Sequence, residues 1–428
     1  MRRPAPSSPA RVGRAPAGHH LPGQAPHLPQ RPGGGLVHVP AGLLHQVARV
    51  GPLESPWVAA GFGALLVASV AVVVRQRRRR PPGRLRHRWL RRGALAAWLA
   101  GLVTLGGLAG VNSYVGYVPT LPGLLGDLAR PGLGGRGRGS QVLTLRVGAA
   151  ELGVPPDRVY VYLPPGYGAA ADARRRYPVV YLLHGYPGGP EDWFRAARVQ
   201  RTMDAMLADG LVQPMILAAP DANGGWLHDS EMLDQVGGPQ VQRYLVGPVV
   251  RAVDARFRTL ADRAGRAIAG MSSGGYGALN LGLRHQGVYS VVVSLMPYGD
   301  PGARAVGLLG GSRALWLANA PDAYLPTMAF HHRVTVGLLA GSRDPERAEA
   351  RRLAGMLRAR GQVAVFTEVP GATHTWRGAR LEAPYLLAFA SAHLTGSRPA
   401  RVRPVAAGPG RRPPGAPAGL LRRRRVSA

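Results

Sequence analysis

Short apolar runs alternate with amphipathic stretches along residues 141–395. The runs are rich in β-branched residues, which is typical of buried strands, and the stretches between them repeat apolar residues at helical spacing. Strands are predicted at residues 141–147, 158–163, 178–183, 214–219, 266–270, 291–295, 333–339 and 362–369, and helices near 191–209, 240–256, 275–285, 345–360 and 381–393. This alternation predicts an α/β fold, with a mostly parallel central sheet covered by helices on both faces.

Two apolar runs without a charged residue precede this region, at residues 57–74 and 93–111. As helices rising about 1.5 Å per residue, they would extend roughly 27–29 Å, close to the ~30 Å hydrocarbon core of a bilayer. A pair of buried core helices is the alternative, but flanking arginines are typical of membrane spans. The pattern therefore predicts two transmembrane helices that form a hairpin over residues 57–112.

Charge asymmetry orients this hairpin. The loop between the spans, residues 75–92, contains ten arginines, whereas the outer flanks carry Arg49, Arg130, Arg136 and Arg138. Arginine-rich loops are retained in the cytoplasm. We therefore expect a multi-pass protein of the cell membrane whose large domain lies outside the cytoplasm.

The remaining segments are low in complexity. Residues 1–56 and 396–428 are dominated by Pro, Gly, Ala and Arg without periodicity, and such segments bury too little apolar surface to offset the entropy of ordering. We expect both to be disordered tails and residues 113–140 to be a linker. The predicted folded domain is then residues 141–395.

The composition narrows the function classes. The chain has no cysteine, which excludes a disulfide framework, a thiolate metal site and a cysteine nucleophile. The net charge is +32, but residues 141–395 hold only 26 of the 54 basic residues, against 20 acidic ones. Because most of the excess lies in the tails and the hairpin loop, we expect no nucleic-acid partner. We also expect neither a cofactor nor a metal ion.

The sequence Gly270-Met271-Ser272-Ser273-Gly274 follows a predicted strand and precedes a predicted helix. In that setting Gly-x-Ser-x-Gly forms the nucleophile elbow, a tight turn in which the glycines let strand and helix approach. A glycine-rich turn capped by serine is the alternative. Ser272 is the predicted nucleophile, because it has glycine two residues away on both sides and Ser273 does not.

A serine nucleophile needs a base and an acid, which in this architecture follow it in the order Asp or Glu, then His. His374 follows the last predicted strand and is the candidate base, with a surface loop histidine as the alternative. Asp344 follows the strand before it and is the candidate acid. An Asp before Pro345 is also a good helix N-cap, and Asp300 after the preceding strand is the competing acid. The order of the motif favours Asp344.

An acyl-transfer site also needs two N–H donors for the oxyanion. The residue after the nucleophile, Ser273, supplies one. The loop after strand 178–183 supplies the other through the backbone of Tyr186, since Pro187 has no N–H. Tyr186, Trp226 and Trp376 are candidates for lining a substrate cleft, and packing in the core is the alternative for each.

Four collinear segments carry a family resemblance: residues 162–167, 177–188, 269–285 and 371–376. Together they resemble the putative esterase family, also called the esterase D or antigen 85 type, of the α/β-hydrolase superfamily. The resemblance implies an α/β-hydrolase fold over about residues 141–395, in which position 273 often carries a larger apolar residue than serine. The N-terminal hairpin is similar to that of membrane-anchored actinobacterial members.

The resemblance implies a membrane-anchored serine hydrolase that cleaves carboxylic acyl esters through a Ser-His-Asp triad and an acyl-enzyme. Two alternatives stay open: an acyltransferase of the mycolyltransferase type that moves an acyl group to a sugar hydroxyl, and a noncatalytic envelope-binding protein with a hydrolase fold. The expected partners are an acyl-ester small molecule or an envelope glycolipid as substrate, and the lipid bilayer.

Overall fold

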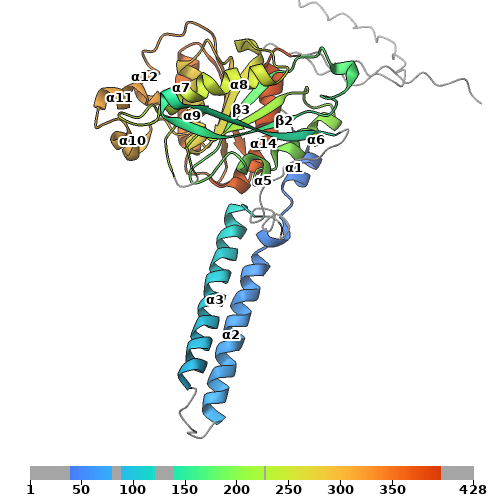
Figure 1. Ribbon diagram of the computed structural model, residues 1–428, viewed down its shortest axis with the longest axis vertical. Coiled ribbons are helices and arrows are strands. Elements are labelled where there is room, and N and C mark those ends of the chain that lie inside the picture. The colour runs from blue at the N-terminus through green and yellow to red at the C-terminus, as the bar shows by residue number, and fades with distance from the viewer. Residues whose placement is uncertain (1–38, 80–87, 119, 121–138, 226–227, 397–428) are drawn as a thin grey trace, which may run out of the picture. The chain divides into compact units, whose positions relative to one another are not determined.

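Eight strands form one mixed sheet at the centre of the fold, in the order β1-β2-β4-β3-β5-β6-β7-β8. The computed structural model describes residues 39–79, 88–118, 120, 139–225 and 228–396 (Figure 1). β1 and β2 pair antiparallel with each other and β2 with β4, whereas all other neighbours are parallel. The strands are β1 (Gln141–Ala149), β2 (Val154–Leu163), β3 (Val179–Leu183), β4 (Ile216–Pro220), β5 (Arg266–Met271), β6 (Val291–Leu295), β7 (Thr335–Gly341) and β8 (Val363–Val369).

Helices bury both faces of this sheet. Strand β2 shows the division, because Val159 and Val161 join one hydrophobic cluster while Tyr160 and Tyr162 join the other, as the two-residue period of a strand requires. Figure 1 shows α7 and α8 across the sheet from α6 and α14. The first cluster includes α7 (Val241–Val246), α8 (Pro248–Arg256), α9 (Ser273–Arg284) and α13 (Arg347–Ala359), and the second includes α5 (Asp192–Arg195), α6 (Val199–Ala208) and α14 (Trp376–His393).

The predicted α/β class is confirmed, and each predicted strand overlaps an observed one. Two predicted helices are each divided in the structure. The stretch 191–209 breaks at Arg198, whose φ of 54° is not helical, and 240–256 breaks between Gly247 and Pro248. Pro248 begins the new helix because its ring has no N–H to continue the old one.

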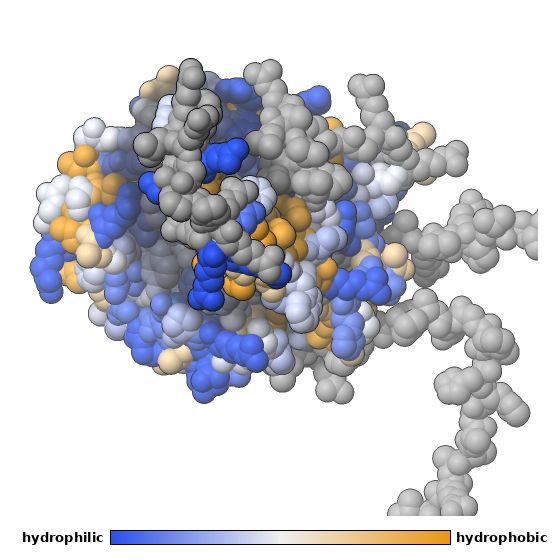
Figure 2. Space-filling model, turned by 90° about the horizontal axis from the view of Figure 1, so that it is seen from below, coloured by the Kyte–Doolittle hydropathy of each residue, from blue (hydrophilic) through white to orange (hydrophobic). Residues whose placement is uncertain are grey.

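Three short helices between β6 and β7 were not predicted: α10 (Gly302–Leu308), α11 (Arg313–Ala318) and α12 (Pro321–Tyr324). They are too short, and too interrupted by Gly and Pro, to show a helical period. Ala305 and Leu309 pack on Leu233 and Tyr276 as a small third cluster. Helices α10 and α11 carry exposed apolar side chains, among them Val306 and Leu315. Figure 2 shows apolar surface at the left, the side on which Figure 1 places these helices.

The chain before the hairpin differs from expectation. Residues 39–56, predicted as part of a disordered tail, contain α1 (Ala41–Val47) and a 3₁₀ turn, η1 (Pro52–Glu54). Val39, Leu43 and Val47 are buried in the same cluster as α6 and α14. Four-residue spacing puts them on one helical face, but three apolar residues in a Pro- and Gly-rich stretch give a weak signal. Residues 1–38, 121–138 and 397–428 of the predicted tails and linker lie outside the described residues.

The two apolar helices are α2 (Pro56–Arg79) and α3 (Arg88–Val115), which lie side by side in Figure 1. Segments Pro56–Gln76 and Trp89–Val115 are long and apolar enough to cross a membrane, and they are almost entirely unburied in the structure. Trp98 Nε1 donates to Ser69 Oγ at 3.0 Å, which joins the two helices. Length and composition alone support a membrane span, so the crossing itself stays a prediction.

A buried ion pair ties the start of the hairpin to α14. Glu54 is fully buried, and its Oε1 and Oε2 accept from Arg380 Nη2 at 2.6 Å and Nη1 at 3.0 Å. Arg380 is 2% exposed and also donates to the carbonyls of Ala196 and Gly116. Burial alone would raise the pKa of Glu54, but the hydrogen bonds from Arg380 and from Gly51 N–H outweigh it and hold that pKa below its ordinary value.

Replacing one partner of this pair should be costly. Arg380→Met leaves the Glu54 carboxylate buried with much weaker pairing, and we expect the free energy of unfolding to fall by about 3–5 kcal/mol. Denaturant unfolding of the detergent-solubilised chain, followed by tryptophan fluorescence, measures this loss. The double variant Glu54→Leu/Arg380→Met should recover part of it, because no carboxylate is left buried without its main partner. Arg198, which also pairs with Glu54 Oε2 at 3.2 Å, keeps 16% of its side chain exposed and can be hydrated there. Arg377→Met, one helical turn away and only partly buried, is the matched control, and an equal loss in that variant would contradict the prediction.

Candidate active site

Ser272 lies on a strained turn between β5 and α9. Its φ is 56° and its ψ is −122°, a conformation that residues with a side chain rarely adopt. The two flanking glycines make the turn possible, because a Cβ on Gly270 would collide with the Gly274 carbonyl and a Cβ on Gly274 would collide with the Leu183 carbonyl. Strand, helix and the end of β3 therefore meet at backbone contact distance.

His374 and Asp344 reach this turn from two other loops. His374 follows β8, and its Nε2 lies 2.8 Å from Ser272 Oγ. Asp344 follows β7, and its Oδ1 lies 3.1 Å from His374 Nδ1. With Nδ1–H donating to the carboxylate, Nε2 is left to accept the serine hydroxyl. The structure thus brings the three predicted residues into one hydrogen-bonded chain, while their catalytic roles stay predictions.

Asp344 and His374 differ in how far their side chains are buried. The side chain of Asp344 has no exposed surface, whereas that of His374 is 27% exposed. A buried carboxylate holds an imidazole in orientation, and a partly exposed imidazole can meet substrate. Asp344 Oδ1 also accepts from Glu346 N–H at 2.8 Å, so Asp344 shapes the turn before α13 as well.

Asp300, the competing acid, lies elsewhere. It follows β6, and its Oδ1 accepts from Gly302 N–H at 2.6 Å. Among the described residues it makes no ion pair with His374. It lines a separate hollow of about 440 Å³ together with Glu231, Asp322 and other carboxylates.

The two predicted oxyanion donors come from the elements that meet at the turn. Ser273 is the first residue of α9, where a backbone N–H has no partner within the helix and the positive end of the helix dipole favours an anion. Tyr186 lies in the loop after β3, and the guanidinium of Arg304 stands 5.2 Å from the centre of its ring. Arg304 is in turn 3.8 Å from Asp229.

His184 holds the loop after β3 in place through both nitrogens of its ring. It is fully buried, its Nδ1 lies 3.0 Å from the Gly185 carbonyl, and its Nε2 accepts from Ala222 N–H at 3.0 Å. Both ring nitrogens are therefore engaged in fixing the loop between β3 and α5. The ring is a structural element of the loop, and within the described part of the chain it forms no hydrogen bond with Ser272 Oγ.

The three residues predicted to line a substrate cleft lie in different surroundings. Trp376 is 5% exposed and packs edge-on against Trp193, with ring centres 5.6 Å apart, so it belongs to the core. Tyr186 is partly exposed. Trp226 lies outside the described residues.

Glu382 is a neighbour of the site that no sequence motif singles out. It lies fully buried on α14, and neither carboxyl oxygen has a hydrogen-bond partner among the described residues. The second oxygen of Asp344, Oδ2, is also buried and has no hydrogen-bond partner among the described residues. Burial, and then the charge of Asp344, raise the pKa of Glu382 well above its ordinary value, which favours the neutral form of this second carboxyl.

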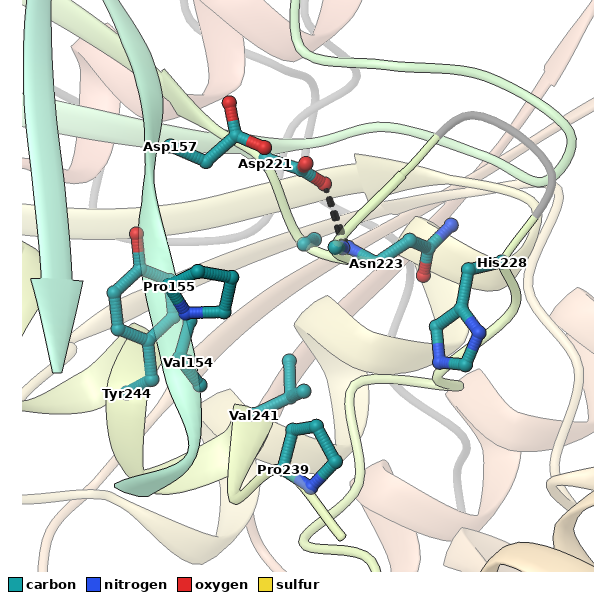
Figure 3. Close-up of a pocket in the computed structure, with 11 residues that line it drawn as sticks. Val154, Pro155, Asp157, Asp221, Asn223, His228, Pro239, Val241 and Tyr244 are labelled. Atoms are coloured by element: carbon teal, nitrogen blue, oxygen red, sulfur yellow. Dashed lines mark hydrogen bonds between the residues drawn. The ribbon is translucent and has the colours of Figure 1, made fainter. Parts of the chain in front are cut away.

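A further hollow of about 240 Å³ lies two strands from Ser272, at the same edge of the sheet (Figure 3). Asp221, which follows β4, borders it and accepts from the N–H groups of Asn223 and Gly224. Burial opposes ionisation of Asp221, but hydrogen bonds to its carboxylate, that of Asn223 N–H among them, hold its pKa below the ordinary value. No group of three or more His, Cys, Asp or Glu side chains in the described part of the chain is placed to hold a metal ion.

The mixed sheet and the strand-turn-helix at Ser272 define the class of the protein as an α/β-hydrolase. Within that class, residues 156–394 match the model of the family described as "Putative esterase". The chain therefore belongs to this esterase family, and the class that the family defines is carboxylic ester hydrolase.

Relatives fit this assignment. The chain is 32% identical over 118 residues to an endo-1,4-beta-xylanase/feruloyl esterase of Xylanibacter ruminicola. The aligned segment covers 27% of this chain and 16% of that protein. It is 34% identical over 133 residues to an esterase of Mycobacterium tuberculosis. This aligned segment covers 31% of this chain and 27% of that protein. The chain thus spans less than a third of the length of these relatives.

Solved structures share the fold. A ferulic acid esterase superposes with a TM-score of 0.52 at 22% identity, covering 60% of this chain and 99% of that one. An S-formylglutathione hydrolase from Agrobacterium tumefaciens superposes with a TM-score of 0.51 at 17% identity, covering 61% and 98%. At these identities the likeness concerns the fold.

The position of the acid can be tested by an amide exchange. Asp344→Asn should keep the fold but lower kcat by ~10³–10⁴, because the amide no longer holds His374 in the right tautomer or stabilises its imidazolium. Asp300→Asn is the matched control and should leave kcat nearly unchanged. Steady-state kinetics on a p-nitrophenyl ester measure both. The reverse ranking would make Asp300 the acid and leave Asp344 with its role in the turn.

Proposed function

We propose that this chain is a membrane-anchored serine esterase, which hydrolyses carboxylic acyl esters through an acyl-enzyme on Ser272. The observation that carries the proposal is the continuous hydrogen-bonded chain from Ser272 through His374 to Asp344, set on a strained turn. Membership of the esterase family supports the same reaction class.

In the first half-reaction, Ser272 Oγ attacks the ester carbonyl while its proton passes to His374 Nε2. Asp344 stabilises the imidazolium that forms. The N–H groups of Ser273 and Tyr186 are proposed to bind the negative oxygen of the tetrahedral intermediate. The C–O bond to the leaving alkoxide then breaks, and His374 returns the proton to that alcohol.

In the second half-reaction a water molecule gives its proton to His374 and attacks the acyl-enzyme. The acid is released and Ser272 recovers its proton. The same intermediate would serve an acyltransferase if a sugar hydroxyl replaced water, and nothing in the described residues favours that acceptor. We therefore place hydrolysis first.

The substrate class follows from the chemistry: an ester of a carboxylic acid, as a small molecule or as an envelope glycolipid. The two longest apolar helices support the anchoring, and the arginine-rich loop supports a domain outside the cytoplasm. Residues 141–395 are proposed as the catalytic domain, with residues 39–56 and 112–118 packed on it.

Active-site labelling tests the nucleophile. Ser272→Ala removes the attacking oxygen but keeps both N–H donors, so we expect it to abolish fluorophosphonate labelling and ester turnover while the unfolding midpoint stays close to that of the wild type. Ser273→Ala is the matched control, because it retains the backbone N–H. It should stay active, with a changed preference among p-nitrophenyl esters of rising chain length, since the Ser273 side chain is buried beside the nucleophile.

A wild-type chain that folds and binds acyl esters, yet shows neither labelling nor turnover, would refute the esterase proposal. That outcome would favour a noncatalytic envelope-binding protein. Label on Ser272 that is discharged only by an added sugar would favour the acyltransferase.

Topology is tested separately by proteolysis. If loop 75–92 is cytoplasmic, protease added to intact cells should release the esterase domain, because the large domain is outside. Trypsin should cut the arginine-rich loop only in inverted vesicles. Protection of the domain until the cells are lysed would contradict this orientation.

A further inference from the structure

The segment that follows α3 reaches the loop carrying the proposed Tyr186 donor. Tyr117 is the residue that makes contact: its hydroxyl donates to Asp192 Oδ1 at 2.5 Å. The other oxygen of Asp192, Oδ2, accepts from Gly189 N–H at 2.8 Å. Asp192 is fully buried. One carboxylate therefore joins the end of the hairpin to the donor loop, residues 184–189.

The carboxylate sits directly beneath this loop. A Cβ on Gly188 would lie 2.6 Å from Asp192 Oδ2 and 3.0 Å from the Gly185 carbonyl. Only a residue without a side chain fits between them. The loop is thus folded around Asp192, and the position of its backbone depends on where that carboxylate is held.

The opposite side of the same segment is fixed to α14, the helix that begins two residues after His374. Arg377 Nη1 donates to the Ser113 carbonyl at 3.2 Å, and Arg380 Nη2 donates to the Gly116 carbonyl at 2.8 Å. Residues 112–118 accordingly touch the two structures that must stay in register for the proposed reaction: the donor loop and the base of the histidine loop.

The segment is itself rigidly held. Asn112 Nδ2 donates to the carbonyls of Leu53 at 2.9 Å and Val118 at 2.8 Å, and its Oδ1 accepts from Val118 N–H at 2.7 Å. These bonds close residues 112–118 into a loop and join it to the turn that precedes α2. The two ends of the hairpin are therefore clamped together where Tyr117 projects toward Asp192.

We propose that Tyr117, in the segment at the end of the membrane hairpin, is a positioning residue for the active site, which sets the oxyanion-donor loop through Asp192. The proposal rests on the esterase function proposed above. It assigns Tyr117 no contact with substrate, and it makes the anchor a component of catalysis as well as a tether.

The charge on Asp192 gives the proposal a specific readout. Burial raises the pKa of Asp192 to about 6, against the lowering effect of the Tyr117 and Gly189 hydrogen bonds. His184 and Glu191 are the other titratable groups that act on it, with opposite signs. Losing the Tyr117 hydroxyl removes a donor to the ionised form, which moves this pKa upward. The donor loop should then lose its carboxylate acceptor at a higher pH.

The experiment uses the full chain in detergent and a p-nitrophenyl ester, with Tyr117→Phe as the test variant. We expect kcat to fall about tenfold to a hundredfold, less than the ~10²–10³ lost when an oxyanion donor is removed outright, with KM changed less than about threefold. The acid limb of the kcat profile should move to higher pH. In an Asp192→Asn background the same Tyr117→Phe change should no longer move that limb, because no carboxyl titrates there.

Tyr114→Phe is the matched control, since Tyr114 belongs to the same segment and is 62% exposed; its kcat and pH profile should equal those of the wild type.

The proposal is overturned if Tyr117→Phe leaves kcat within twofold and the acid limb in place, or if it lowers activity only in proportion to unfolded protein without moving the limb. Fluorophosphonate labelling of wild-type Ser272 separates the two proposals. Labelled wild type with a normal Tyr117→Phe profile removes this inference alone, whereas absence of labelling removes the esterase function on which it rests.

Discussion

The turn at Ser272 depends on three backbones lying closer together than side chains normally allow. β5 ends, α9 begins and β3 passes alongside within the space left by Gly270 and Gly274. This contact fixes the strained dihedral angles of Ser272, and it places the loop after β3 next to the hydroxyl. The chains that deliver Asp344 and His374 leave the sheet at the same edge, because β5, β7 and β8 run parallel. Close packing at this turn thus determines where the proposed nucleophile and oxyanion donors can lie, and the parallel strands bring the loops of Asp344 and His374 to the same edge.

The parts of the structure that could be predicted from the sequence are those with a local sequence pattern, such as hydrophobic periodicity or a short motif. The strands are recognisable as runs of β-branched residues, and the candidate residues follow such runs. Parallel pairing therefore predicts that Ser272, Asp344 and His374 lie at the same edge of the sheet. What could not be predicted depends on contacts between distant segments without a pattern of their own. Tyr117 and Asp192 are 75 residues apart, and Glu54 meets Arg380 across 326. Helix α1 was missed because a seven-residue helix offers only two turns of periodicity.

Buried carboxyl groups show three different solutions to one electrostatic problem, in a chain whose net charge is +32. Glu54 stays ionised because a buried guanidinium and a backbone N–H compensate its lost hydration. Asp192 is intermediate, since neutral donors compensate only in part and its pKa rises to about 6. Glu382 has no donor among the described residues, so the neutral form is favoured beside Asp344. The number and charge of the donors decide the protonation state, and burial alone does not.

These carboxyl groups also change how the hairpin should be regarded. A flexible tether would make few contacts with the domain that it holds, because each contact reduces the freedom of the linker. Here the chain entering α2 is fixed through Glu54 to α14, and the chain leaving α3 is fixed through Gly116 to the same arginine and through Tyr117 to the donor loop. Arg380 therefore binds both ends of the hairpin at one point of the fold. Together with the bond from Arg377 to the Ser113 carbonyl, these contacts fix both ends of the two apolar helices on α14 and on the loop after β3, so the hairpin is joined to the domain by specific contacts as well as by the chain.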